Sequence, residues 1–181
     1  MHNLANTTQM TIAHAHPAPP LIHDMLKRER MDLRTLVSQA TETLKPPIGE
    51  RRHRLTLAMP DEPVWLWADA GRLEQVFVNL LANASRYTDT GGELNVWVHR
   101  RDRQAVVRVR DNGRGIARDS LPHIFDLFTR GHDTGRHCPS GLGIGLAVVR
   151  HLVELHGGRV TAASAGAGQG SEFTVRLPTE N

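Results

Sequence analysis

The sequence has very little cysteine, few aromatic residues and no long apolar segment, and each shortage excludes a class of protein. Cys138 is the only cysteine among 181 residues, so neither an intrachain disulfide nor a cysteine-based zinc cluster is available. Aromatic residues make up 4% of the chain, which leaves few rings to stack on bases. No apolar run approaches the roughly 20 residues that span a bilayer. These shortages predict a cytoplasmic protein without a membrane segment.

Basic residues are in slight excess, but they are spread along the chain. The formal net charge is +3, and the two short basic clusters, at 51–54 and 100–103, are expected to be exposed hairpin ends. No nucleic-acid partner is expected, because phosphate-backbone binding needs a concentrated basic face. The eleven histidines show no metal-site spacing and are expected to lie scattered on the surface.

Patterned segments predict one domain, residues 31–181, after a leader at 1–30. The leader lacks periodicity up to about residue 20, and a short charged helix follows from about 22 to 30. Asp32 is expected to cap a helix that Pro46-Pro47 ends. Two alternating segments, 54–59 and 64–67, predict a hairpin across a turn.

The remaining segments complete an α/β (α+β) two-layer sandwich, with helices on one face of a mixed, mostly antiparallel sheet. Asp69 is expected to cap a second long helix, and a third follows the glycines after Gly141. A short apolar helix near 121–128 leads into a stretch rich in Gly, His and Pro that predicts a mobile lid. Four further strands are expected, at 93–99, 105–110, 160–163 and 172–177.

The helix after Asp69 carries a polar stripe beside a wider apolar one. At about 100° per residue, one narrow face collects three amides and two guanidinium groups, and another collects leucines and Phe77. An ordinary solvated face is the alternative for such an Asn pair, but the neighbouring motifs favour ligand binding. The stripe consists of Arg72, Gln75, Asn79, Asn83 and Arg86.

The run Asp111-Asn112-Gly113-Arg114-Gly115 places a carboxylate at the end of a strand, before two glycines. An aspartate there can accept a hydrogen bond from an exocyclic amine such as that of adenine, and glycines let the backbone approach a ring. A turn between two strands is the alternative. The helix expected to begin near Ile116 argues against that alternative.

The run Gly141-Leu142-Gly143-Ile144-Gly145-Leu146 opens an apolar helix whose free N–H groups suit phosphate oxygens. It is not a Rossmann fingerprint, which lies in the first βαβ unit, and it is not a Walker loop, because no Lys-Ser/Thr follows the glycines. It therefore indicates phosphate binding of a different design.

Taken in order, these motifs and Phe125-Asp126-Leu127-Phe128 resemble the ATP-binding catalytic domain of sensor histidine kinases, over roughly residues 32–178. That family belongs to the Bergerat-fold ATPases, with topoisomerases, mismatch-repair ATPases and heat-shock chaperones. The resemblance implies ATP and Mg²⁺ as cofactors, with Asn83 as the magnesium ligand and Asp111 at the adenine amino group. It further implies that Asn79, Arg86 and Arg130 act on the phosphates.

The resemblance also gives the remaining positions a place around the nucleotide, and it makes Phe125 and Phe128 anchors of the lid. Tyr87 and both phenylalanines have a packing role in the core as their alternative, and Arg130 has that of a solvated charge. The further nucleotide-contacting residues are Tyr87, Gly113, Gly115, Ile116, Phe128, Gly141, Leu142, Gly143, Ile144, Gly145 and Leu146.

Asn79 favours phosphoryl transfer over ATP hydrolysis. Hydrolytic members of the superfamily carry a glutamate here to activate water, and an amide has no comparable basicity. The family places an acceptor-histidine hairpin before this domain, and that element is missing here. His23-Asp24 is the nearest partial match to its motif. The chain is thus expected to be a fragment, an isolated catalytic domain or a kinase acting on a histidine elsewhere, and to be monomeric.

The predicted function is that of a protein-histidine kinase catalytic domain in two-component signalling. Its implied partners are a histidine-containing dimerisation domain and a response regulator. Two alternatives remain: a serine kinase of the anti-sigma type, and a nucleotide-binding adaptor without transfer activity.

Overall fold

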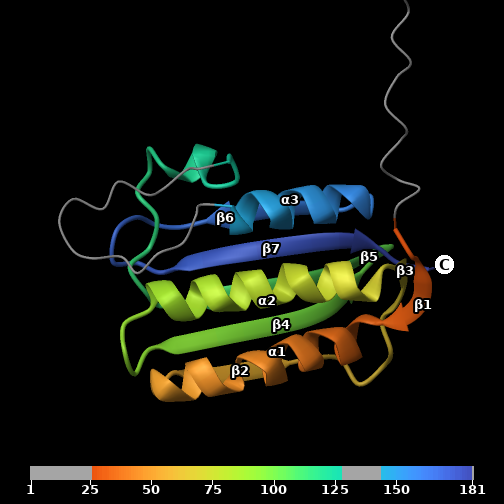
Figure 1. Ribbon diagram of the computed structural model, residues 1–181, viewed down its shortest axis with the longest axis horizontal. Coiled ribbons are helices and arrows are strands. Elements are labelled where there is room, and N and C mark those ends of the chain that lie inside the picture. Colours follow the sequence, from red (N-terminus) through yellow and green to blue (C-terminus); the bar gives the residue numbers. More distant parts are fainter. Residues whose placement is uncertain (1–25, 128–143, 181) are drawn as a thin grey trace, which may run out of the picture.

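Five strands form the main sheet of the computed structural model, which describes residues 26–127 and 144–180 (Figure 1). β2 pairs with β4 in parallel, and all other neighbours are antiparallel. The mixed, mostly antiparallel sheet predicted from the sequence is therefore confirmed. In spatial order, the strands are β2 (Arg54–Ala58), β4 (Glu93–Arg101), β5 (Gln104–Asp111), β7 (Ser171–Pro178) and β6 (Arg159–Ala163).

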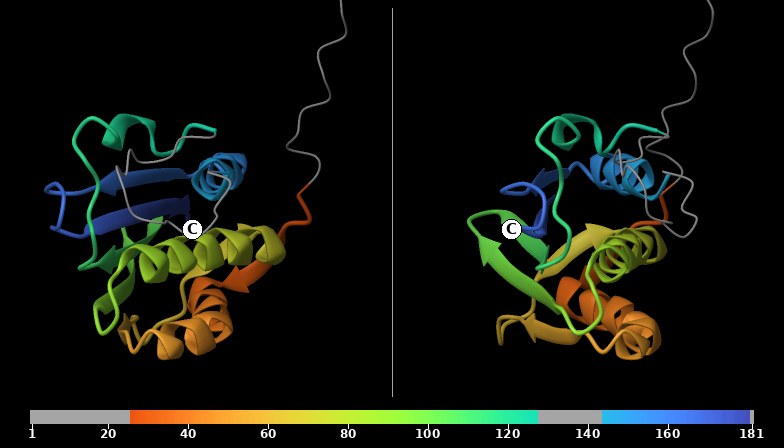
Figure 2. Two further views of the ribbon diagram at one scale, coloured as in Figure 1. Left: turned by 60° about the vertical axis from the view of Figure 1, so that its left-hand side comes forward. Right: turned by 90° about the vertical axis from the view of Figure 1, so that its left-hand side faces the viewer.

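Three helices cover one face of this sheet, as Figure 2 shows from two sides. They are α1 (Leu33–Glu50), α2 (Ala70–Tyr87) and α3 (Gly145–Leu155). The core lies between the helices and the inward side chains of the strands, such as Leu94, Val107 and Val175, each at most 1% exposed. The predicted two-layer sandwich is thus confirmed. None of the helices in the described ranges is long and apolar enough to cross a membrane.

Helix α2 begins and packs as its sequence predicts. The Asp69 carboxylate accepts a hydrogen bond from the Arg72 N–H at 3.1 Å, which satisfies one of the free donors of the first turn. The apolar stripe is buried in the core: Leu73, Val76, Phe77, Leu80, Leu81 and Ala84. The polar stripe lies outside this buried face, with its residues exposed or half-buried.

Helix α1 has the predicted start but not the predicted end. Asp32 caps it, accepting from the Arg34 N–H at 3.1 Å and pairing with the Arg34 guanidinium. The expected stop at Pro46-Pro47 is wrong, because the helix continues to Glu50. The proline rings cost backbone hydrogen bonds, but the last turn brings Ile48 into the core at 4% exposure, and that burial favours continuation.

The hairpin expected between 54–59 and 64–67 is wrong. β2 pairs with β4, and β3 (Trp65–Ala68) pairs instead with β1 (Glu29–Asp32) in a separate two-stranded sheet. Alternation of apolar and polar residues fixes which face of a strand is buried, but it does not choose the partner strand.

The charged helix expected up to Arg30 is wrong for the described residues from 26 onward. Residues 26–28 have no regular structure, and Glu29 and Arg30 belong to β1. Long-range pairing with β3, together with a hydrogen bond from the Lys27 N–H to Asp69, overrides local helix preference. The earlier part of the leader lies outside the described residues.

Two smaller expectations also need correction. The short helix near 121–128 is a 3₁₀ turn, Leu121–His123, and the lid stretch from 128 to 143 lies outside the described residues. His53 and His156 are buried at 8% and 5% exposure, so the histidines are not all on the surface. The 100–103 cluster does form an exposed hairpin end, whereas 51–54 joins α1 to β2.

Candidate functional site

The Asp111 carboxylate is held at the end of β5 by three hydrogen bonds. Its Oδ1 accepts from the Gly113 N–H at 2.9 Å and from the Ser171 N–H at 3.3 Å, and its Oδ2 accepts from the Ser171 hydroxyl. The side chain is buried, at 3% exposure. A carboxylate fixed in this way is pre-positioned to accept a further hydrogen bond from a ligand. The segment after it does not return as a strand, so the alternative of a hairpin turn is wrong.

Gly113 and Gly115 are required for close chain packing. A Cβ on Gly113 would lie 2.2 Å from the Tyr87 carbonyl oxygen, and one on Gly115, at φ +69°, would lie 2.1 Å from the Gly166 carbonyl oxygen. Contact with other backbone therefore requires both glycines, and the room that they leave for a ring remains a prediction. The Arg114 N–H also donates to the Tyr87 carbonyl at 2.9 Å, which ties this loop to the end of α2.

The amide stripe of α2 lies open beside the first turn of α3. Asn79, Asn83 and Arg86 are half-buried, and within the described residues their side chains form no hydrogen bond or ion pair. The Asn79 side-chain oxygen lies 3.9 Å from the Cβ position of Gly145. The structure thus places the amide motif beside Gly145, the described end of the glycine motif, with polar groups that no described residue engages.

Helix α3 begins at Gly145 without a side-chain cap from the described residues. Ile144 occupies its N-cap position, and Leu146 is half-buried and packs against the core. Free N–H groups at a helix start, with the positive end of the helix dipole, favour an anion. The other predicted residues of this motif, Gly141, Leu142 and Gly143, lie outside the described residues, as do Phe128 and Arg130.

The predicted residues around this centre occupy different environments. Tyr87 is 43% exposed at the end of α2, so its alternative role in the core is wrong. The helix expected to begin near Ile116 is wrong, because Ile116 lies in an irregular segment. It packs against the core, with its N–H donating to the Ser164 hydroxyl at 3.0 Å. Phe125 packs edge-to-face on Phe173 with the ring centroids 6.2 Å apart, which anchors the segment leading to the lid stretch.

Sequence reasoning missed Thr88 and Ser171. Thr88 is 2% exposed, and its hydroxyl has no hydrogen-bond partner among the described residues; it lies 2.8 Å from the Cβ position of Gly113. Ser171 supplies two of the three bonds to Asp111. Ser171 follows Gly170, whose φ is +68°, so a glycine directly before a strand was the available signal. Thr88 had no comparable signal.

The oxygen and nitrogen donors of this site fit a metal–nucleotide complex better than a protein-held metal ion. In the described ranges, no group of three or more His, Cys, Asp or Glu side chains could hold a metal. Mg²⁺ usually keeps several waters and binds through substrate phosphates with one or two protein oxygens. The amide oxygen of Asn83 and the Thr88 hydroxyl, which have no partner in the part of the chain that the structure describes, suit such a ligand.

Comparison with known proteins gives the site a family context. The family model of histidine kinase-, DNA gyrase B- and HSP90-like ATPases matches residues 68–181. Sensor histidine kinase TrcS of Mycobacterium tuberculosis is 40% identical over 158 residues, which is 84% of this chain and 30% of TrcS. The histidine-protein kinase BaeS of Escherichia coli is 35% identical over 150 residues, covering 83% of this chain and 32% of BaeS. The chain spans about a third of the length of these two relatives.

Solved structures give the same result. A mycobacterial sensor histidine kinase, MprB, aligns with a TM-score of 0.73 at 25% identity, over 84% of this chain and 99% of that one. Full-length ShkA in complex with AMPPNP aligns with a TM-score of 0.73 at 29% identity, over 86% of this chain and 32% of that one. The predicted sandwich and the predicted resemblance are both confirmed.

Proposed function

Since the chain belongs to the family of histidine kinase-, DNA gyrase B- and HSP90-like ATPases, we propose that it is the ATP-binding catalytic domain of a two-component sensor histidine kinase. The observation that carries this proposal is the buried Asp111 carboxylate, which lies opposite Leu94 on the helix-covered face of the sheet, where α2 carries its amide stripe. Nucleotide binding needs an acceptor for the base and donors for the phosphates. Asp111 supplies the first, and the stripe of α2 supplies the second.

In this proposal, Asp111 accepts a hydrogen bond from the adenine amino group. Guanine has a carbonyl at the corresponding position, which cannot donate to a carboxylate, so ATP is preferred over GTP. The buried Thr88 hydroxyl is a further polar group for the base or for a bridging water. Gly113 lets this loop pack against the end of α2, and Gly115 lets it pack against the backbone at Gly166.

The triphosphate then extends toward α2 and the start of α3. Asn79 and Arg86 donate to phosphate oxygens, and the N–H groups at Ile144 and Gly145, where no described side chain caps the helix, add uncharged donors. The role assigned to Arg130 remains a prediction. Asn83 is the proposed Mg²⁺ ligand; when bound, the metal neutralises charge on the phosphates.

Asn79 makes transfer the proposed chemistry instead of hydrolysis. An amide cannot remove a proton from water, so this position holds the γ-phosphate in place without activating a competing nucleophile. Phosphoryl transfer depends mainly on positioning and on charge neutralisation. The acceptor nucleophile is therefore supplied from outside the site.

The proposed acceptor is a histidine on a dimerisation domain, from which the phosphoryl group passes to a response regulator. The two relatives described above, TrcS and BaeS, are histidine kinases, which supports this assignment. ATP is drawn from the cytoplasm, so we place the domain there.

The test is transfer in trans. The purified chain is incubated with Mg²⁺ and γ-³²P-ATP, together with the dimerisation domain of a relative such as TrcS, and an Asn83→Ala variant serves as the negative control. We expect label on the acceptor that is labile to acid and stable to alkali, as phosphohistidine is. Acid-stable label on a serine would identify the anti-sigma type of kinase. A second acceptor is a dimerisation hairpin fused to the chain. ATP binding without label on either acceptor would favour the nucleotide-binding adaptor.

A further inference from the structure

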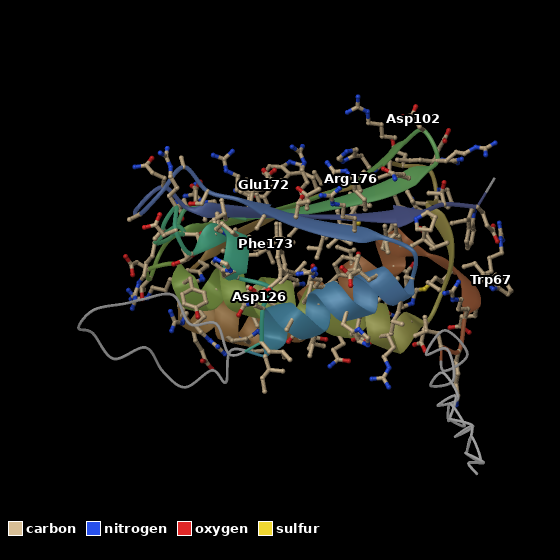
Figure 3. All side chains as sticks on the ribbon, turned by 90° about the horizontal axis from the view of Figure 1, so that it is seen from above. Trp67, Asp102, Asp126, Glu172, Phe173 and Arg176 are labelled. Carbon is tan, nitrogen blue, oxygen red and sulfur yellow. The ribbon has the colours of Figure 1, made fainter. Side chains whose placement is uncertain are left out.

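The face of the sheet that points away from the helices carries a concentration of basic side chains. Figure 3 shows Glu172, Arg176 and Asp102 on this outer side and Phe173 on the helical side. The register sets His99 opposite Val106 and Val106 opposite Arg176, so the three share one row across β4, β5 and β7. No helix within the described residues covers this face (Figure 2).

A hollow of about 540 Å³ lies in this face, at the end of the sheet near the β4–β5 hairpin. Its charged lining consists of Arg101, Arg108, Arg176 and Asp102, with His99 beside them. Three guanidinium groups and one carboxylate leave the lining with a net charge of +2 while His99 is neutral. The volume exceeds that of a single phosphate group, so it also accommodates part of the molecule that carries one.

The Arg108 side chain has one hydrogen-bond donor, Nε, that no described residue accepts from. Its Nε is buried, and no hydrogen-bond partner for it exists in the described ranges 26–127 and 144–180. The guanidinium lies 5.2 Å from the centroid of the Trp97 ring, which is its cross-strand neighbour and holds it in a cation–π contact. A buried unpaired donor costs free energy, so an acceptor that enters the hollow gains a hydrogen bond that the free protein lacks.

The positive charge of the hollow also acts on His99. Its burial, and then its proximity to Arg108, Arg101 and Arg176, lower the pKa of this histidine below its ordinary value. Asp102 is the single acidic group in the lining and does not offset them. An anion between these groups would remove the repulsion and raise the pKa of His99 again.

We propose that this hollow binds the dianionic phosphate group of a small phosphorylated compound. A phosphate monoester carries a charge of about −1.5 to −2 at pH 7, which matches the +2 of the lining. Arginine forks bind phosphate oxygens in pairs, which favours phosphate over a single carboxylate. Because the hollow and α2 lie on opposite faces of the sheet, this ligand and the nucleotide bind at the same time.

The experiment is an NMR titration with inorganic phosphate at pH 7.5 and constant ionic strength, following the Arg108 Nε–H and His99 ring signals. We expect both signals to shift along one saturable curve and the pKa of His99 to rise. Arg176→Gln should weaken binding about tenfold or more, because it removes a charge-assisted bond. Arg101→Gln is a second variant, at a hairpin position whose substitution does not threaten the fold.

Arg54→Gln is the matched control, since it removes the same charge from the same sheet. Arg54 pairs with Glu93, six residues and so about 20 Å along β4 from His99. The Arg54→Gln variant should bind phosphate with the affinity of the parent chain. Saturation of the parent chain with ATP should leave its phosphate titration curve unchanged. A linear drift without saturation, an equal loss in Arg54→Gln, or competition by ATP would each overturn the proposal.

Discussion

The two ends of the helical layer differ in whether their polar groups have hydrogen-bond partners among the described residues. At one end, the start of α2 meets the end of α3. The Asp69 carboxylate accepts from the backbone N–H groups of Arg72 and Lys27, and the Asp69 N–H donates to His156 Nε2 at 3.1 Å. His156 Nδ1 lies 2.7 Å from the Leu152 carbonyl oxygen, which completes the set.

At the other end, the final turns of α2 meet the start of α3, and the polar groups remain open. Asn79, Asn83 and Arg86 have no hydrogen-bonded partner within the described residues, and α3 starts there without a side-chain cap. Both ends join the same two helices, so the difference does not come from helix packing. Paired groups at the first end stabilise the fold, and the groups at the second end, which lack partners within the described residues, are the ones that we propose bind the nucleotide.

The largest expected effect is that of Asp111→Ala on ATP affinity. Removal of a carboxylate that bonds the adenine amine should weaken ATP binding about a hundredfold, since a hydrogen bond to a charged group contributes about 1.5–3 kcal/mol. The matched control is Asp69→Ala at the paired end. It should cost about 1 kcal/mol of stability through loss of the helix cap and leave ATP affinity within about twofold. Calorimetry and urea unfolding of both variants measure the two effects, and an exchange of the two phenotypes would contradict the comparison.

The next effect concerns the loop after Asp111, which packs closely against the end of α2. In Gly113→Ala, the new methyl group would lie 2.2 Å from the Tyr87 carbonyl oxygen, so the loop must shift at a cost of about 1–3 kcal/mol. Gly49→Ala is the control, because nothing lies within 4 Å of its Cβ position in α1. Urea unfolding should show a clear loss in the first variant and a small gain in the second. Equal stabilities would mean that this loop is not closely packed.

Asn83→Ala sharpens the assignment within the polar stripe. Affinity for ATP with Mg²⁺ should fall about tenfold, while affinity without Mg²⁺ changes little, because the amide acts through the metal. Gln75→Ala lies on the same stripe about 12 Å toward the start of the helix and should change neither affinity. Calorimetric titrations with and without Mg²⁺ separate these outcomes, and equal losses in both conditions would contradict the metal-ligand role.

The smallest effect is a pH dependence at the paired end. Burial lowers the pKa of His156 below its ordinary value in the folded state, and nearby Arg28 adds to this shift against the opposing effects of Leu152 and Asp69. A lowered folded-state pKa means that the contribution of His156 is complete above about pH 6.5 and is lost as the pH falls through the folded pKa. Urea unfolding between pH 8 and pH 5 should show this loss in the parent chain and a flatter profile in His156→Ala. The exposed His151→Ala is the control and should keep the parent profile.

The placing of the polar stripe of α2 and of Asp111 was predictable from the sequence, because both depend on local patterns of apolar and polar residues. The spacing of apolar residues in α2 fixed which face is buried, and that left Asn79 and Asn83 on the open side. Asp111 could be placed at a strand end because the preceding alternation stops there. These inferences need no knowledge of distant partners.

The features that the sequence could not predict depend on distant contacts. The pairing of β3 with β1 instead of β2, and the continuation of α1 past Pro47, are both decided by what the segment meets in the fold. The roles of Thr88 and Ser171 emerge only where three segments converge around Asp111 and Gly113. His53 and His156 likewise become buried through contacts with residues more than 30 positions away.

The most direct test of the nucleotide site is a calorimetric titration of the unmodified chain with ATP and with GTP, each with and without Mg²⁺. The account predicts a single saturable site for ATP, strengthened by Mg²⁺, with clearly weaker binding of GTP. Absence of ATP binding, or equal affinity for the two nucleotides, would contradict the assignment of Asp111 and of the open end of the helices.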